Sequence, residues 1–368
     1  MKKLFLLFVM IVAGLMASDS AMAQKQTMPV TDIEKHIKKE VQYAILLMDN
    51  GMVKESIHFL DSMNVVHPDN YLIMFELGYA YMLDKDYKKS LKIYKYMCDK
   101  LPDADAQTYQ MLGTLYDYNG DAKKSVEAYK KGLKKFPNSG LIYCELGIMS
   151  LKENDYNSAL DYFEKGIAVE PDYSPNYYRA AQLLMGSNQR AWGMIYAETM
   201  ALMPSREGRK EEVMKMMTDV INEKITHRGD TVHIAFNKVN VVDTYADAIA
   251  GLYEVGYYKA ATIKKQSDRF SIKELIEMRS GLMEVAQTLD GVVYLLDYLC
   301  KVTDAGHWEA YNYWLFYEVN PEEANAWYEE NSNKIDAFAS WYEENPFLPS
   351  TEHRMSRLQF LQTVENKE

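Results

Sequence analysis

Cysteine is scarce in this sequence, with three residues in a chain of 368 and the first of them at position 98. So small and odd a number excludes a disulfide framework as the main source of stability. Cys98 and Cys144 also lie too far apart along the expected helices to bridge each other. We therefore expect a fold held by a packed core, in which both are small buried apolar residues.

Long apolar runs are also lacking. Beyond residue 16 no stretch is apolar for 18 residues, so no membrane insertion is expected. The one shorter run, residues 4–16, follows Lys2 and Lys3 and precedes Ala21-Met22-Ala23, which is the pattern of a signal peptide cleaved before Gln24. No cysteine lies near this site to carry a lipid anchor. We expect an exported protein, periplasmic or secreted.

Positive charge is in deficit, with 41 Lys and Arg against 53 Asp and Glu and a formal net charge of −12. An acidic surface repels phosphate backbones and anionic lipid. Nucleic acid and the membrane surface are therefore not expected as main partners. The same excess is also a common means of keeping a protein soluble.

Catalytic motifs are missing as well. The sequence has no Gly-rich phosphate loop, no paired-histidine zinc motif, no paired CxxC and no βαβ pattern. We expect no enzyme and no cofactor. His227, Asp230 and His233 form the one cluster with ligand-like composition, but they lack a recognised metal-binding spacing and are interpreted as solvated loop residues.

Proline is scarce too, but five of the ten prolines recur at steps of 33 to 35 residues, at positions 68, 102, 137, 171 and 204. A fixed period in this range indicates stacked supersecondary units. Three other sets of residues recur with the same period, and we call each set a column. Small residues recur at Ala44, Gly78, Gly113, Gly147 and Ala181, and again at Ser56, Ser90, Ser125, Ala159 and Gly193; large ones recur at Leu60, Tyr94, Tyr129 and Phe163.

The columns describe a pair of helices. Turn residues such as Asn119-Gly120-Asp121 separate the two small columns, so they end one helix and begin the next. Small residues let two antiparallel helices approach closely. Proline at the end of the unit cannot continue the second helix, because it has no N–H and its ring clashes with the preceding turn. The sequence therefore predicts an all-α fold.

This pattern resembles the tetratricopeptide repeat (TPR). The resemblance is clearest in Leu77-Gly78 with Tyr81, Tyr94 and Pro102, and the next two units repeat it. It implies about five repeats over 37–205, stacked as a right-handed α-α superhelix, with degenerate units at 37–70 and 174–205. The resemblance identifies the fold much better than the function, since such arrays serve unrelated processes.

The resemblance also implies a partner-binding groove, lined by the fifth and ninth positions of each first helix and by residues near them. These residues are Val41, Ile45, Met48, Phe75, Tyr79, Met82, Gln110, Thr114, Asp117, Cys144, Ile148, Tyr178, Gln182 and Met185. The fifth and ninth positions hold no Lys, Arg or Asn, so a carboxylate clamp is not implied. Either a partner segment or the chain's own C-terminal helices can cover an apolar groove. Alternatively, these side chains only pack between units.

Beyond residue 205 the period fades. Helices are expected over 209–224, 244–260, 271–288 and 291–302, with an irregular connection near 226–242 that includes a short extended segment. A helix is expected over 322–344, and a last one after Ser350-Thr351. The expected organisation is a signal peptide (1–23), an N-terminal segment (24–36), the repeat array (37–205) and a helical C-terminal region (206–368).

Two functions follow from these features. The first is an exported TPR scaffold that binds a protein or peptide partner through the groove, within a cell-envelope complex. The alternative is a glycan-binding protein, in which C-terminal aromatic residues stack on sugar rings; the candidates are Trp308, Trp314, Trp327 and Trp341. Helical sugar-binding proteins of this kind are usually lipid-anchored and longer, and this chain departs from them in both respects.

Overall fold

The computed structural model describes residues 32–203, 209–238, 244–263, 265, 267–289 and 291–361. The described chain is helical apart from one two-stranded hairpin, which confirms the all-α prediction. It divides into two compact units at Asp155, inside the array predicted over 37–205. We call residues 32–155 the N-terminal unit and residues 156–361 the C-terminal unit, and we describe each by itself.

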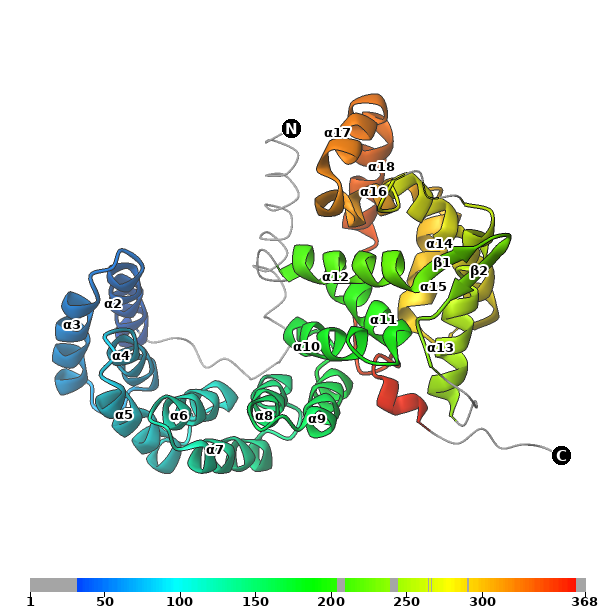
Figure 1. Cartoon of the computed structure of the whole chain (residues 1–368). Coiled ribbons are helices and arrows are strands. Elements are labelled where there is room, and N and C mark those ends of the chain that lie inside the picture. The colour runs from blue at the N-terminus through cyan, green and yellow to red at the C-terminus, as the bar shows by residue number, and fades with distance from the viewer. Residues whose placement is uncertain are drawn as a thin grey trace. The chain divides into compact units, whose positions relative to one another are not determined.

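The N-terminal unit is a row of antiparallel helix pairs (Figure 1). Its helices are α2 (Asp32–Asp49), α3 (Val53–Val66), α4 (Tyr71–Leu83), α5 (Tyr87–Lys100), α6 (Ala106–Tyr118), α7 (Ala122–Lys135) and α8 (Gly140–Lys152). Helices α3, α5 and α7 follow one side of the row and α2, α4 and α6 the other. We call the side of α2, α4, α6 and α8 the inner face and the side of α3, α5 and α7 the outer face.

The predicted turns end and begin the helices as expected. Each turn places one residue in the left-handed region, at Gly51 (φ 78°), Lys85 (φ 63°), Gly120 (φ 78°) and Asn154 (φ 58°). Asp86 and Asp121 then cap the following helices by accepting the backbone N–H groups of Lys89 and Lys124. The second helices α3, α5 and α7 each end two residues before the periodic proline.

The two columns of small residues lie where the helices of a pair cross. A Cβ atom on Gly78 would lie 2.6 Å from the Tyr94 ring, and one on Gly113 would lie 2.2 Å from the Tyr129 ring. The serine column joins the same helices, since Ser90 Oγ donates to the Gly78 carbonyl oxygen at 2.7 Å. The aromatic ring of the second helix thus fills the space that the glycine leaves open.

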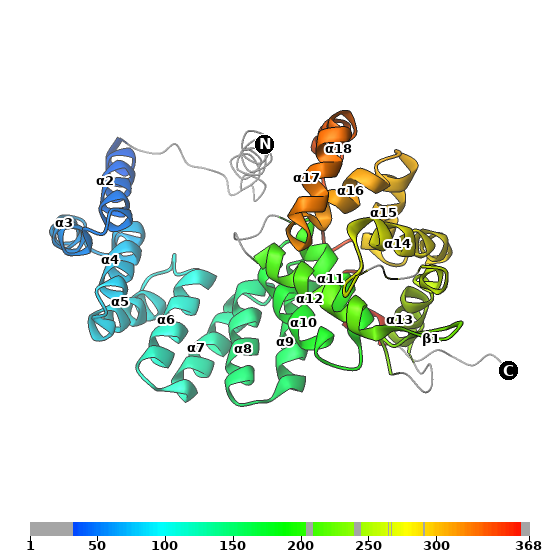
Figure 2. The ribbon, with the colours of Figure 1, turned by 45° about the horizontal axis from the view of Figure 1, so that its top comes forward.

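The C-terminal unit begins with three helices of the repeat type and continues as an irregular helical assembly (Figure 2). Its elements are α9 (Tyr156–Val169), α10 (Ser174–Met185), α11 (Arg190–Ala201), α12 (Arg209–Lys224), β1 (Ile225–Arg228), β2 (Thr231–Ile234), α13 (Tyr245–Val255), η1 (Tyr258–Ala261), α14 (Ile272–Ala286), η2 (Gln287–Leu289), α15 (Tyr294–Asp304), α16 (Trp308–Leu315), η3 (Tyr317–Val319), α17 (Pro321–Glu330), α18 (Ser332–Glu344) and η4 (Arg357–Phe360).

The single helix predicted over 322–344 is wrong, because the chain breaks at Asn331 into α17 and α18. The pentapeptide Trp-Tyr-Glu-Glu-Asn occurs at the end of both helices. In each copy the asparagine side chain donates to the carbonyl oxygen of its own tryptophan at 3.0 Å, Asn331 to Trp327 and Asn345 to Trp341. The repeated pentapeptide is therefore a helix-ending element, and its second copy marks a second helix end.

The last helix predicted after Ser350-Thr351 is also wrong within the described residues, where only the short η4 forms. Tertiary contacts hold this segment instead. Arg357 donates two hydrogen bonds of 2.8 Å to the two carboxylate oxygens of the buried Glu164 on α9. Phe360 packs on Trp192 of α11, with ring centroids 5.7 Å apart. Residues 362–368, into which this helix was expected to extend, lie outside the described residues.

A fully buried ion pair joins three helices of the C-terminal unit. Arg279 on α14 donates to Glu198 on α11, and both side chains have no solvent exposure. Tyr311 on α16 donates its hydroxyl to the same carboxylate at 2.7 Å, and Arg279 donates to the Asn312 side chain at 2.5 Å. These polar contacts tie α11, α14 and α16 together inside the core.

Candidate functional site

The inner face of the N-terminal unit carries half-buried aromatic side chains. Phe75 and Tyr79 lie one turn apart on α4, and neither is fully covered. The Phe75 ring meets Tyr94 edge to face at 5.4 Å and Tyr71 at 5.8 Å. Neighbouring rings therefore hold Phe75 in position while part of its surface stays open to a ligand.

Polar groups continue this face on α6 and α8. The Gln110 side chain donates to Glu145 at 2.9 Å and to Thr114 at 3.3 Å. The Thr114 hydroxyl is also 3.2 Å from the Tyr129 hydroxyl. Farther along α6, Asp117 pairs with Lys152 of α8. Side chains on α6 and α8 are thus joined to each other at this face.

Carboxylates make this face more acidic than its fifth and ninth positions suggest. Burial raises the pKa of Glu76, which follows Phe75 on α4, and the charge of Asp49 raises it further. Burial also raises the pKa of Glu145, whereas the hydrogen bond from Gln110 lowers it. A cation brought next to these half-buried carboxylates is favoured, because it offsets their lost hydration.

Three other predicted groove residues of this unit are part of its core. Val41, Met48 and Cys144 are buried, with 5%, 8% and 5% of their surfaces exposed. Ile45, Met82 and Ile148 are half-buried. Buried side chains contribute to packing between helices, so the accessible part of the face consists of its half-buried residues, which include Phe75, Tyr79, Gln110 and Thr114.

In the C-terminal unit the corresponding positions are covered by the chain itself. The Tyr178 hydroxyl donates to Glu212 of α12 at 2.5 Å, and the Gln182 side chain donates to the same carboxylate at 3.1 Å. The guanidinium of Arg209 lies 5.2 Å from the centroid of the Tyr178 ring. Met185 is buried. Helix α12 therefore occupies this part of the predicted groove.

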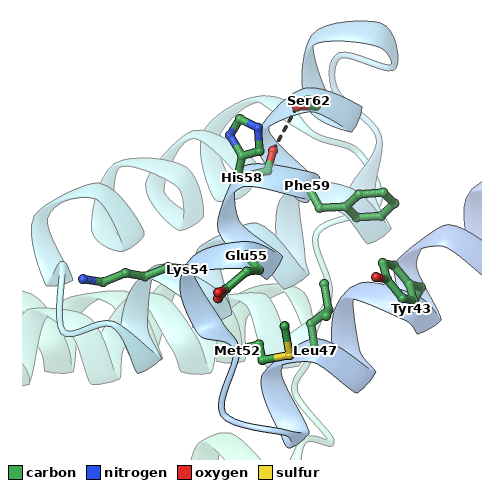
Figure 3. Close-up of a pocket in the computed structure, with 8 residues that line it drawn as sticks. All are labelled: Tyr43, Leu47, Met52, Lys54, Glu55, His58, Phe59 and Ser62. Carbon is green, nitrogen blue, oxygen red and sulfur yellow. Dashed lines mark hydrogen bonds between the residues drawn. The ribbon is translucent and has the colours of Figure 1, made fainter.

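A shallow hollow of about 690 Å³ opens between α2 and α3 at the start of the array (Figure 3). Its apolar part includes Tyr43 and Phe59, whose rings meet edge to face at 5.3 Å, together with Leu47 and Met52. Tyr43 occupies the sequence column of Leu77 and is 52% exposed, whereas Leu77 is buried at 2%. The hollow therefore lies on the face that another repeat covers elsewhere in the array.

The ligand-like cluster of the connection is divided between the two faces of a hairpin. The connection contains a two-stranded hairpin, in which β1 and β2 pair Thr226 with His233 and His227 with Val232. Adjacent residues of a strand point to opposite faces, so His227 and His233 point away from each other. No group of three His, Cys, Asp or Glu residues in the described ranges is arranged to hold a metal ion.

The tryptophans of the glycan alternative already contact other groups of the protein. Trp327 lies parallel to Tyr313 at 4.3 Å. The Lys210 ammonium lies 3.2 Å from the centroid of the Trp314 ring, and burial lowers the pKa of Lys210 to about 7. The Arg279 guanidinium lies 5.3 Å from the centroid of the Trp308 ring. Trp341 contacts the rings of His307 and Tyr298, so all four candidate rings are already in contact with protein groups.

Comparison with known families agrees with the helix pairs. A family model described as "Tetratricopeptide repeat" matches residues 106–138 and 141–173. These two segments are tetratricopeptide repeats. The matched segments include the Gly113, Tyr129 and Pro137 columns, and the flanking repeats of lower sequence similarity have the same helix-turn-helix form.

Solved structures similar to this repeat protein include two of MamA and one of YrrB. MamA from Desulfovibrio magneticus RS-1 is 24% identical over 37% of this chain and 76% of its own, with a TM-score of 0.33. Another MamA is 18% identical over 42% and 89%, with a TM-score of 0.35. YrrB, titled a TPR protein with an unusual peptide-binding site, is 14% identical over 52% and 92%, with a TM-score of 0.33. No curated protein matches this sequence.

The described helices include none that is both long and apolar enough to cross a membrane.

The sequence identified the positions of the inner face through the repeat period, but it did not identify Glu76 and Glu145. Each of them directly follows a fifth position of a first helix, so their place next to the predicted groove residues was the available sequence signal.

Proposed function

We propose that this protein is a scaffold that binds a segment of another protein on the inner face of its N-terminal unit. The observation that carries the proposal is the half-exposed pair Phe75 and Tyr79, beside carboxylates whose burial is incomplete. Such a surface fits a segment with an apolar anchor and a nearby lysine or arginine. The equivalent positions Tyr178 and Gln182 are engaged by α12, so the partner segment binds the N-terminal unit.

The double variant Phe75→Ala/Tyr79→Ala is expected to weaken partner binding by about 30-fold or more, because losing a central anchor costs roughly 2 kcal/mol. A photo-crosslinker at position 79 first identifies the partner, and titration of the purified pair then measures Kd. We also expect the affinity to fall as salt is raised, since Glu76 and Glu145 are only half-buried.

Tyr96→Ala is the matched control, because Tyr96 is 40% exposed on the outer helix α5. It removes an aromatic ring of the same unit without touching the inner face. An unchanged Kd for the Phe75/Tyr79 variant excludes the inner face as the binding surface. A Kd that rises equally in the Tyr96 variant shows that the effect is not local.

We further propose that the chain is exported and acts in the cell envelope. The support is the basic start, the apolar run of residues 4–16 and the small residues Ala21 and Ala23. N-terminal sequencing of the mature protein is expected to begin at Gln24, and a retained Met1 contradicts export.

A further inference from the structure

The outer face of the N-terminal unit is strongly basic on two neighbouring helices. Helices α5 and α7 carry eleven lysines and only two acidic residues, Asp99 and Glu127. All eleven side chains are exposed: Lys88, Lys89, Lys92, Lys95, Lys100, Lys123, Lys124, Lys130, Lys131, Lys134 and Lys135. A chain with a net charge of −12 thus presents one local surface of the opposite sign.

The repeat places these lysines side by side. Lys88, Lys95 and Lys100 on α5 stand 35 residues before Lys123, Lys130 and Lys135 on α7, so equivalent positions of consecutive second helices carry the same charge. Each helix has 14 residues and is about 21 Å long. The outer helix α3 does not continue the pattern, since it ends on exposed Val65 and Val66.

Most of this charge is not neutralised locally. Three of the lysines pair with aspartates, Lys89 with Asp86, Lys124 with Asp121 and Lys131 with Asp99. The other eight make no ion pair with a described residue. Because charges more than about 8–10 Å apart are screened at physiological salt, acidic residues far from this face reduce its local potential little.

We propose that the outer face of α5 and α7 docks on the surface of an anionic phospholipid bilayer. The N-terminal unit contains no arginine, so the face has flexible, hydrated point charges rather than planar groups for bidentate recognition. Protein interfaces are depleted in lysine, whereas lysines near an anionic membrane each add to the attraction without specific geometry. The exposed Tyr96 lies among these lysines, and tyrosine side chains are enriched at the level of the lipid headgroups.

The net charge of the sequence predicts repulsion from an anionic bilayer, because it averages over the whole chain. Residues 156–368 hold 33 acidic and 21 basic residues, which gives −12 and equals the charge of the full chain. The remainder of the chain is therefore neutral overall. Within its N-terminal unit the positive charge is concentrated on the outer face, while Glu76, Asp117 and Glu145 lie on the inner face.

Co-sedimentation with lipid vesicles tests this docking. The mature chain is mixed at low salt with vesicles of equal parts phosphatidylglycerol and phosphatidylcholine, and in parallel with phosphatidylcholine vesicles. Binding to the anionic vesicles alone is expected, and it should weaken as salt is raised. Each lysine near such a surface contributes roughly fivefold to partitioning, so K88Q/K92Q/K95Q/K130Q is expected to bind on the order of 100-fold or more weakly.

The matched control is K215Q/K273Q/K301Q/K334Q, which removes four exposed lysines of the C-terminal unit and lowers the net charge equally. Circular dichroism checks that both variants stay folded. No binding of the wild-type chain to anionic vesicles, or equal losses in the two variants, overturns the proposal. So does tighter binding to a short DNA duplex than to the vesicles, because it assigns the face to a soluble polyphosphate. The inner face is unchanged in both variants, so loss of vesicle binding and loss of partner binding on the inner face can be measured independently.

Discussion

The Arg279→Met variant is expected to lose about 3–5 kcal/mol of unfolding free energy, the usual cost of leaving one charge of a buried pair without its partner. Glu198 has no solvent exposure, and its contacts are the Arg279 guanidinium and the Tyr311 hydroxyl. Without Arg279 the buried carboxylate keeps a single hydrogen bond, from Tyr311. Urea denaturation followed by tryptophan fluorescence measures the loss.

Tryptophan fluorescence reports on one unit only, because all five tryptophans of the chain lie beyond residue 190. The control is the double variant Glu198→Leu/Arg279→Met, which removes both charges. Replacing a buried pair by apolar residues of similar size is often close to neutral, so the double variant should regain most of the stability. A single variant as stable as the wild type would falsify the view that this ion pair is buried.

The Gly113→Leu variant is expected to destabilise the N-terminal unit by about 1–3 kcal/mol or more, as overpacking of a close helix crossing does. The first added carbon already lies 2.2 Å from the Tyr129 ring, and that ring is buried at 1% exposure. Far-UV circular dichroism should detect an earlier transition. The tryptophan signal of the C-terminal unit should keep its midpoint.

Two controls separate overpacking from a general intolerance of leucine. Gly251→Leu lies inside α13, where an added Cβ meets nothing within 4 Å, so its effect should be small or stabilising. Adding Tyr129→Ala to Gly113→Leu makes room at the crossing, and the two changes should partly compensate each other. A Gly113→Leu melt at or above the wild-type midpoint means that the helix pairs are assigned wrongly.

The columns of small and large residues predicted the helix pairs because each repeat contacts its neighbours in the same way. The structure also explains their variation. Where the second helix has Tyr94 or Tyr129, the first helix has glycine, and where it has Leu60, the first helix has Ala44. The pair keeps a similar total volume, so these substitutions in the degenerate first repeat preserve the crossing.

The aromatic C-terminal region was predictable only in part. Helical periodicity places Trp327, Phe338 and Trp341 on faces that pack, but it does not separate one helix from two when the break is an asparagine. The contact between Arg357 and Glu164 lies between residues 193 positions apart. No local pattern encodes such a contact, and it holds a segment whose apolar spacing alone predicted a helix.

The sequence by itself determined the repeat, the turns, the glycine positions at the crossings and the residues that line the first helices, because these depend on contacts that recur every 33 to 35 residues. The tertiary structure decided which of those lining residues are available to a partner. Glu212 of α12 accepts hydrogen bonds from the Tyr178 hydroxyl and the Gln182 amide, whereas Phe75 and Tyr79 stay half-exposed. Net charge likewise conceals the basic face of α5 and α7, since only the fold determines which charges share a surface.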